Sequence, residues 1–248
     1  MTVQLDGIDL VIFDKDGTLI DFGTMWSGWA ETLAGRLGEA TGRPVDGPLF
    51  AMLGYDPVAR RVTPGGGLAA TPMARLRERT RDVLVGVGVP ATVADDALAI
   101  AWHAPDPQGL AQPLADLVVL FARLRASGRR VAVATTDDRD PTVRTFAALG
   151  LSDAIDALVC ADDGVPVKPA PDMVVHLCVA LDIPPVQTAV VGDSPADLQM
   201  AHAAGAGLVV GVLTGVGGRD DLEPLADVIL DSVGAIAAAV AEPPGPTT

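Results

Sequence analysis

Few residues of this sequence are of the kinds that mark secreted, membrane-bound or nucleic-acid-binding proteins. Cysteine occurs only twice among 248 residues, too rarely for a disulfide framework, so we expect Cys160 and Cys178 to be buried thiols of a protein in a reducing cytoplasm. Basic residues number 17 against 32 acidic ones, which gives a net charge of -15 at pH 7. Because such a charge repels phosphate backbones and anionic lipid headgroups, neither nucleic acid nor a membrane is an expected partner.

A secretory signal and a membrane-spanning segment are also not indicated. Residues 1–9 contain two aspartates and no basic residue, which is unlike the start of a secretory signal. The longest stretch without a charged residue, Leu198–Gly218, contains six glycines and several polar side chains. It divides into the end of a helix followed by a strand, so we expect no transmembrane helix there.

The remaining composition is that of a globular protein with a sizeable core. Hydrophobic residues make up 49% of the chain, and short β-branched runs alternate with segments of helix length, a pattern that predicts parallel βαβ units. The expected strands are Ile8–Phe13, Val131–Thr135, Ala157–Ala161, Thr188–Val191, Leu208–Val212 and Val228–Leu230. The expected helices between them are Leu114–Ala126, Thr142–Leu149, Pro171–Leu181, Pro195–Ala204 and Val233–Val240.

The chain between the first two expected strands is much longer than one crossover helix requires. Residues 20–112 contain no convincing strand, so an inserted helical domain is the economical interpretation. Its crossings to the core, residues 21–23 and 105–109, have the composition of hinges, and Pro64–Gly67 that of a flexible joint. We predict a core of residues 1–20 and 113–242, an inserted domain of residues 21–112 and a disordered tail of residues 243–248. The expected helices of the insertion are Thr24–Thr41, Thr71–Val85 and Thr92–His103.

Two carboxylates, Asp14 and Asp16, follow the first expected strand. In an open α/β sheet, ligands bind at the carboxyl ends of the strands, where these two acids are expected. Acids so placed can bind a cation and divide nucleophilic and acid–base roles, and the turn at Gly17 and Thr18 offers backbone N–H groups to an anion. The alternative is a solvated pair of aspartates in a turn at the end of the strand.

Two further carboxylates, Asp193 and Asp197, follow the expected strand Thr188–Val191. If that strand neighbours the first one, four acids meet, and their repulsion is relieved by a hard cation, for which Mg²⁺ is the obvious candidate. Capping of the following helix explains one of these acids well and the second poorly.

Lys168 stands in a proline-rich loop and is one of only two lysines in the chain. A compact ammonium group neutralises a phosphate or a carboxylate as a point charge, although a solvated surface lysine is the more common case. Thr135, at the end of its expected strand, has a hydroxyl for the same anion, and Thr136 has a backbone N–H.

Four motifs follow one another along the chain: DKDGTL at residues 14–19, Thr135, Lys168-Pro169 and GDSPAD at residues 192–197. Together and in this order they resemble the motifs of the haloacid dehalogenase superfamily of phosphohydrolases. The resemblance implies a Rossmann-like, three-layer α/β core and Mg²⁺ as cofactor. The long insertion after the first motif resembles the α-helical cap of the phosphoglycolate phosphatase and β-phosphoglucomutase branch. Residues 21–112 are therefore called the cap below.

The resemblance also implies a role for each motif residue. Asp14 would be the nucleophile that forms an aspartyl-phosphate, and Asp16 would protonate the leaving alcohol and then deprotonate water. The implied metal ligands are the Asp14 carboxylate, the Asp16 backbone carbonyl and Asp193. Ser194 lies just outside the coordination sphere, and Asp197 either lies there as well or orients Lys168. The residues implied in binding the substrate phosphate are Gly17, Thr18, Thr135, Thr136 and Lys168.

Two features depart from the family pattern. Lys15 occupies a position that is usually apolar, and strand alternation predicts that it points away from the site. Asp137 and Asp138 follow Thr135, where a small polar or basic residue is frequent. They either cap the next helix or contact polar groups of the substrate, and we favour capping. Among the other candidates, Trp26 and Trp29 are expected in the core of the cap unless one faces the cleft and contacts the substrate. The histidines His103, His176 and His202 share no metal-ligand spacing.

These observations predict a Mg²⁺-dependent phosphatase that acts on a small phosphorylated metabolite, either phosphoglycolate-like or a sugar phosphate. A phosphosugar mutase is the alternative, because both share the core motifs and differ in the cap. A non-catalytic binding domain on the same fold is disfavoured by the four intact motifs. The acid at position 16 argues against the dehalogenase and phosphonate-cleaving branches, and the oligomeric state stays open.

Overall fold

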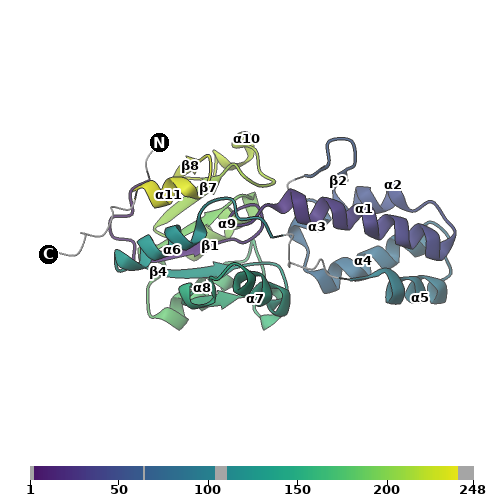
Figure 1. The fold of residues 1–248 in the computed structure, drawn as a ribbon, viewed down its shortest axis with the longest axis horizontal. Coiled ribbons are helices and arrows are strands. Elements are labelled where there is room, and N and C mark those ends of the chain that lie inside the picture. Colours follow the sequence, from purple (N-terminus) through teal and green to yellow (C-terminus); the bar gives the residue numbers. More distant parts are fainter. Residues whose placement is uncertain (1–2, 64, 104–110, 240–248) are drawn as a thin grey trace.

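The computed structural model describes residues 3–63, 65–103 and 111–239. Its core is a six-stranded parallel sheet in the order β5-β4-β1-β6-β7-β8, which confirms the predicted α/β class (Figure 1). β1 lies between β4 and β6, and all its residues are buried. The strands are β1 Leu10–Phe13, β4 Arg130–Ala134, β5 Ala157–Val159, β6 Thr188–Gly192, β7 Leu208–Val212 and β8 Val228–Leu230.

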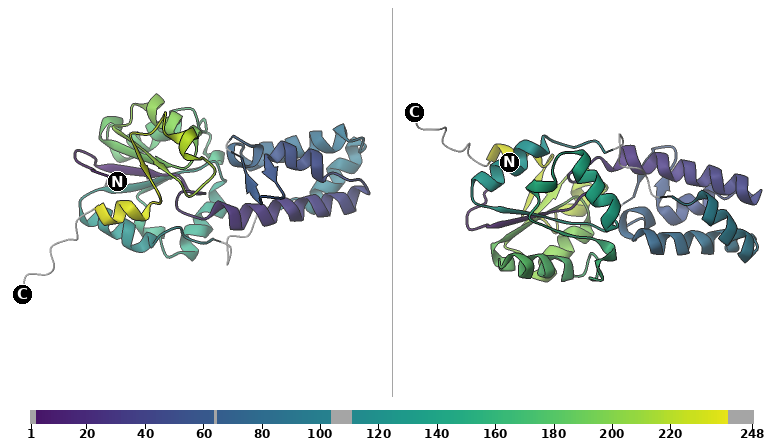
Figure 2. Two further views of the ribbon diagram at one scale, coloured as in Figure 1. Left: turned by 90° about the horizontal axis from the view of Figure 1, so that it is seen from above. Right: turned by 60° about the horizontal axis from the view of Figure 1, so that its bottom comes forward.

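Helices cover both faces of this sheet and produce three layers (Figures 1 and 2). Alternate residues of β1 enter two separate cores, because successive side chains of a strand point to opposite faces. Phe13 packs against Phe121 in one core, and Ile12 packs with Leu177 in the other. The first core contains residues of α6 Leu117–Ala126, α7 Arg139–Ala148 and α11 Gly234–Ala239, and the second contains residues of α8 Asp172–Leu181, α9 Pro195–Ala204 and α10 Arg219–Leu222. Short 3-10 turns lie at Ser152–Ala154, Ala161–Asp163 and Pro185–Gln187.

The cap is an elongated helical body that projects from one end of the core (Figures 1 and 2). It has a hydrophobic core of its own, in which Leu33, Leu76 and Leu98 are at most 1% exposed. Its helices are α1 Phe22–Thr41, α2 Asp46–Leu53, α3 Gly67–Ala70, α4 Met73–Gly86 and α5 Ala91–Ala101, and its short hairpin consists of β2 Tyr55–Asp56 and β3 Arg61–Val62.

The segments that join core and cap lie side by side. Ile20 pairs with Pro113 in an antiparallel bridge, and the Asp21 N–H donates to the Gln112 carbonyl at 2.8 Å. The Asp21 side chain also caps α1 by accepting a hydrogen bond from the Gly23 N–H at 2.9 Å. Residues 21–23, expected as a hinge, are thus the capped start of a helix. The second expected hinge, residues 105–109, and the expected tail, residues 243–248, lie outside the described residues.

Parts of the cap differ from the sequence prediction. The helix α2, the one-turn helix α3 and the β2–β3 hairpin were not expected, because each is too short to show a clear periodicity. Two of the glycines expected as a flexible joint are packed: a side chain at Gly66 would lie 2.9 Å from the Leu53 carbonyl oxygen, and Gly67 is buried and begins α3. The chain can make this turn because glycine permits so close an approach.

The uncharged stretch Leu198–Gly218 is divided between α9 and β7, as expected. In the described ranges, no helix combines the length and the apolar character that crossing a membrane requires.

Both cysteines are buried, as expected, and we predict that neither reacts in the folded protein. Cys160 is 0% and Cys178 4% exposed, and burial raises the pKa of the Cys160 thiol to about 12. Because the thiolate is the reactive form, a disulfide reagent at neutral pH should label neither residue in the native protein and both in denaturant. Rapid stoichiometric labelling of the native protein would contradict this burial.

Candidate active site

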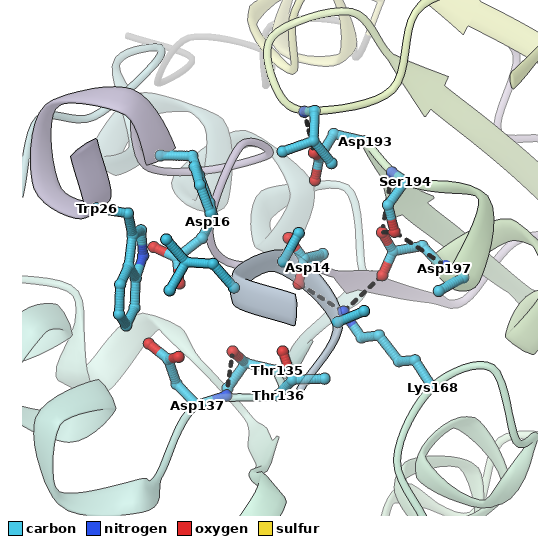
Figure 3. A pocket seen from close by; sticks show the side chains of 16 residues that line it. Asp14, Asp16, Trp26, Thr135, Thr136, Asp137, Lys168, Asp193, Ser194 and Asp197 are labelled. Atoms are coloured by element: carbon cyan, nitrogen blue, oxygen red, sulfur yellow. Dashed lines mark hydrogen bonds and ion pairs between the residues drawn. The ribbon is translucent and has the colours of Figure 1, made fainter. Parts of the chain in front are cut away.

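The carboxyl ends of three neighbouring strands meet at a pocket between core and cap (Figure 3). Asp14 follows β1, Thr135 follows β4 and Asp193 follows β6. Because these strands are parallel and β1 pairs with both neighbours, the three side chains lie at one edge of the sheet. The core also lines the pocket with Asp16, Thr136, Asp137, Lys168, Ser194 and Asp197.

Lys168 lies between two of these carboxylates. Its Nζ is 2.5 Å from Asp14 Oδ1 and 2.5 Å from Asp197 Oδ1 (Figure 3), and the residue is only 8% exposed. Burial opposes its charge, but the neighbouring Asp14 and Asp197 carboxylates raise its pKa above the usual value. Lys168 is therefore a cation at neutral pH and holds Asp14 in a fixed orientation by a charge-assisted hydrogen bond.

The carboxylates of Asp14, Asp193 and Asp197 form a cluster in which the ligand atoms lie within 4.8 Å of one another. Burial raises the pKa of Asp14, an effect that Lys168 opposes; burial also raises the pKa of Asp193, to which Asp14 adds. The single positive charge of Lys168 does not balance the negative charge of three carboxylates. An all-oxygen donor set of this kind suits a hard divalent cation such as Mg²⁺, so the residues present fit the expected metal.

Asp193 is held by two hydrogen bonds. Its Oδ1 accepts from the Thr18 hydroxyl at 3.1 Å and its Oδ2 from the Val216 N–H at 2.8 Å. Asp193 is 2% exposed, so its orientation is fixed by these contacts and by close packing. The contact between the Val216 N–H and Asp193 could not be predicted, because a backbone amide carries no sequence signal.

Asp197 and Ser194 form a capping box at the start of α9. The Ser194 hydroxyl and N–H both donate to Asp197 Oδ2, at 2.6 and 3.1 Å. The other carboxylate oxygen of Asp197 faces Lys168. Asp197 thus takes part in capping the helix and also orients Lys168. Helix capping alone therefore does not account for the acids of this motif.

Of the two backbone N–H groups that the turn at Gly17 and Thr18 was expected to offer to an anion, that of Gly17 is engaged within the turn. The Gly17 N–H donates to the Ile20 carbonyl at 2.7 Å, so it is engaged within the turn, and the Thr18 hydroxyl is used by Asp193. Gly17 has a positive φ of 88°, and a side chain there would lie 2.6 Å from Asp193 Oδ2. Gly17 is therefore required for the turn and for the close approach of Asp193.

Asp16 lies on the cap side of Asp14 in the view of Figure 3. Its Oδ2 forms an ion pair with Lys15 at 2.6 Å, whereas its buried Oδ1 has no hydrogen-bond partner among the described residues. Burial raises the pKa of Asp16 to about 7, although Lys15 opposes this shift. A carboxyl with one free oxygen and such a pKa is suited to exchange protons near neutrality.

The expectation that Lys15 points away from the site is wrong. β1 ends at Phe13, so strand alternation no longer applies to Lys15, and its Nζ lies 2.6 Å from Asp16 Oδ2 and 2.8 Å from Asp137 Oδ2. The expectation that Asp137 caps the next helix is wrong as well, because its carboxylate is engaged by Lys15. Asp138 does occupy the capping position of α7, but its side chain forms no capping hydrogen bond.

Thr135 and Thr136 both line the pocket, as expected. Thr135 is 2% exposed, and its hydroxyl accepts a hydrogen bond from the Asp137 N–H at 3.1 Å (Figure 3). Because the hydroxyl accepts there, its own hydrogen remains available to donate to a bound anion.

The wall that the cap contributes to the pocket is apolar except for one group. It consists of Phe22, Trp26 and Leu68–Ala70. Trp26 is 4% exposed, and its Nε1 has no hydrogen-bond partner within the described part of the chain. Trp26 and Trp29 both belong to the cap core, as expected, but Trp29 does not line the pocket and donates from Nε1 to the His103 carbonyl at 2.6 Å. The apolar wall had no sequence signal beyond ordinary core composition.

Three arginines of the cap are engaged away from the pocket. Arg60, Arg75 and Arg81 form ion pairs with acidic neighbours on the cap surface. Of the residues that the structure describes, no cap arginine lines the pocket.

The sequence matches the family model of the haloacid dehalogenase-like hydrolases over residues 8–205. The chain belongs to this family. It is 32% identical over 206 residues to a phosphoglycolate phosphatase of Rhodospirillum rubrum, covering 81% of this chain and 78% of that protein. It is also 35% identical over 153 residues to a plasmid-encoded phosphoglycolate phosphatase of Cupriavidus necator, covering 60% of this chain and 65% of that protein.

Solved structures of the family show the same fold. A predicted phosphoglycolate phosphatase of Haemophilus somnus superimposes with a TM-score of 0.65 at 18% identity, over 95% of this chain and 99% of that chain. A putative β-phosphoglucomutase of Thermotoga maritima superimposes with a TM-score of 0.63 at 18% identity, over 93% and 98%. The haloacid dehalogenase-like assignment and the Rossmann-like core with a cap are thereby confirmed, and the curated relatives support the expected phosphatase class.

Proposed function

We propose that this haloacid dehalogenase-like hydrolase is a Mg²⁺-dependent phosphatase that cleaves a small phosphorylated metabolite through an aspartyl-phosphate on Asp14. The observation that carries the proposal is the position of Asp14: Lys168 holds it within a buried carboxylate cluster, and Asp16 stands beside it with one free oxygen. One side of the nucleophile thus stabilises charge, and the other side exchanges protons.

In the first step, an Asp14 carboxylate oxygen attacks the phosphorus atom of the ester. A new bond forms between this oxygen and phosphorus, the ester P–O bond breaks, and its electron pair goes to the leaving oxygen, which takes a proton from Asp16. The ammonium of Lys168 and the hydroxyl of Thr135 stabilise the phosphoryl oxygens. Lys168 therefore has two roles: it binds the phosphoryl group and orients the nucleophile Asp14.

In the second step, water attacks the phosphorus atom of the aspartyl-phosphate. Asp16, now ionised, accepts a proton from this water, and the bond between phosphorus and the Asp14 oxygen breaks to release phosphate. Asp16 ends the cycle protonated and Asp14 ionised, so the enzyme returns to its starting state. A pKa near neutrality lets one carboxyl serve both steps.

The Asp14 and Asp193 carboxylates and the Asp16 backbone carbonyl are proposed to hold Mg²⁺, with Asp197 and Ser194 just outside them. When bound, the ion neutralises the nucleophile and the phosphate and polarises the phosphoryl group. Neighbouring residues hold these carboxylates in place: Thr18 and Val216 fix Asp193, and the capping box fixes Asp197.

For the substrate, we propose a small organic phosphate, with phosphoglycolate as a candidate because curated relatives bear that name. A phosphosugar mutase needs a cap group that activates sugar hydroxyls. The described cap residues at the pocket are Phe22, Trp26 and Leu68–Ala70, and none of them has a side chain that can act as a base. The lack of a base in this wall supports a phosphatase, which transfers the phosphoryl group to water, over a mutase, which transfers it back to a bound sugar.

A screen of phosphate esters tests this function. Purified protein with Mg²⁺ is incubated with phosphoglycolate, sugar phosphates and other small esters, and released phosphate is measured. In parallel, the conversion of β-glucose phosphate to its isomer is followed. We expect phosphate release from a small ester without isomerisation; isomerisation that exceeds phosphate release would identify a mutase instead.

Trp26 is expected to contribute to substrate binding through its unpaired indole N–H. Replacing Trp26 by phenylalanine keeps an aromatic wall and removes the donor, so KM for the preferred substrate should rise about 5-fold, the effect of one net hydrogen bond. Inhibition by inorganic phosphate, which lacks the leaving group, should stay unchanged. Trp29→Phe is a less informative control because it also removes the hydrogen bond to the His103 carbonyl. An unchanged KM in Trp26→Phe would contradict the contact.

A further inference from the structure

Lys15 is the most deeply buried charged side chain next to the site that the mechanism does not use. It is 1% exposed, and its Nζ forms ion pairs with Asp16 and Asp137 at 2.6 and 2.8 Å. Its backbone is fixed as well, since its carbonyl accepts from the Leu19 and Ile20 N–H groups at 2.9 and 3.0 Å. Lys15 is thus held rigidly at both ends.

Burying an ammonium group in this position is costly unless its partners are well placed. Lys15 has such partners, because its ammonium group lies between the carboxylates of Asp16 and Asp137. The contact with Asp16 is one-sided: Lys15 engages Oδ2 and leaves the buried Oδ1 without a hydrogen-bond partner in the described ranges. A free oxygen on a buried carboxyl is unfavourable unless another group occupies the space beside it.

We propose that Lys15 is a positioning residue for the acid–base step: it anchors Asp16 by Oδ2 so that Oδ1 presents the proton to the leaving oxygen. This inference rests on the proposed role of Asp16 as the acid. Asp137 completes the anchor, because it holds Lys15 through a second ion pair and belongs to the loop after β4. The DKD sequence thereby places the nucleophile, an anchor and the acid in three consecutive residues.

The competing explanation is that Lys15 only balances the charge of Asp137. The two explanations differ for a double variant, Lys15→Met with Asp137→Asn. This variant removes the ammonium and the charge that it balances, so it should fold well if charge balance is the whole role of Lys15. If Lys15 anchors Asp16, the double variant folds and the acid remains misplaced.

The experiment compares esters that differ in their need for a proton. The alkyl phosphate turned over fastest in the substrate screen has a leaving alkoxide that must be protonated, whereas para-nitrophenyl phosphate has a leaving group that needs no proton. For each, kcat/KM is measured with Mg²⁺, because this ratio covers the steps up to cleavage of the ester bond and not the later attack of water. Melting temperatures of all variants report whether they fold.

For Lys15→Met and for the double variant, we expect kcat/KM for the alkyl phosphate to fall about 100-fold, the usual contribution of a positioned acid. For para-nitrophenyl phosphate, the fall should be less than about 5-fold. A double variant that folds and loses both activities equally, or neither, would overturn the anchoring role. Lys15→Arg, which restores the cation, should recover part of the alkyl phosphate activity if it folds.

Asp16→Asn separates a failure of this inference from a failure of the proposed function. If Asp16→Asn shows the selective loss and the double variant does not, Asp16 is the acid and Lys15 does not position it. If Asp16→Asn also loses both activities equally, the proposed acid is wrong, and the role of Lys15 is refuted with it.

Discussion

Replacing Asp14 by asparagine is expected to lower kcat by about 10⁴-fold or more, because the amide cannot attack phosphorus and the enzyme has no second nucleophile in the same position. The fold should survive the change. An asparagine keeps the shape of the side chain, and loss of one carboxylate from the buried cluster of Asp14, Asp193 and Asp197 removes repulsion. Steady-state phosphate release and a melting curve measure the two effects.

A matched control is Asp153→Asn, which removes an exposed carboxylate in the turn before β5 and should leave activity unchanged. If Asp14→Asn retained even a tenth of the activity, a mechanism through Asp14 would be excluded. If it failed to fold, as shown by loss of the melting transition, the variant Asp14→Ser would test the same point with a smaller side chain.

Removal of divalent metal is expected to abolish activity, and Mg²⁺ should restore it. The buried acids Asp14 and Asp193 lie close together, and Lys168 supplies only one compensating charge, so the site needs a cation before it accepts a phosphate dianion. Phosphate release is measured after treatment with EDTA, after gel filtration and again with Mg²⁺. Asp193→Asn should require a higher Mg²⁺ concentration for half-maximal activity.

Metal binding can also be measured without turnover. A ligand that binds the native state raises the melting temperature, so Mg²⁺ should stabilise the wild-type protein and stabilise Asp193→Asn less at the same concentration. Asp153→Asn should respond like wild type. Full activity in stringently metal-free buffer, with no shift of the melting temperature on adding Mg²⁺, would contradict the assignment of the carboxylate cluster to a metal.

The core could be predicted closely because its signals are local and strong. The strands β7 and β8 and the helix α9 have the predicted bounds, since each is a short apolar run or a capped helix. α7 begins at Arg139, three residues earlier than expected, because Asp138 provides the capping position. The helices of the cap were harder to predict from the sequence. For example, α2 is short and mostly apolar, and its burial against α1 and α4 depends on contacts that are distant in sequence.

The same division holds for the site. Motif spacing was sufficient for Asp14, Lys168 and Asp193, because parallel strands bring their carboxyl ends together. It was insufficient for Lys15, whose direction depends on where β1 ends, since beyond the end of the strand the alternation rule no longer holds. It was also insufficient for Trp26, because helical spacing alone does not tell whether an indole faces the cap core or the pocket.

Trapping the covalent intermediate tests the proposed aspartyl-phosphate mechanism most directly. The enzyme is mixed with Mg²⁺ and substrate that carries radiolabelled phosphate, quenched in acid during turnover and digested, and the labelled peptide is sequenced by mass spectrometry. We expect label on the peptide that contains Asp14, released by mild base as expected of an acyl phosphate, and none in Asp14→Asn. Label on a serine or histidine peptide, or turnover without any enzyme-bound phosphate in an experiment that detects it in a control aspartyl-phosphate enzyme, would contradict this mechanism.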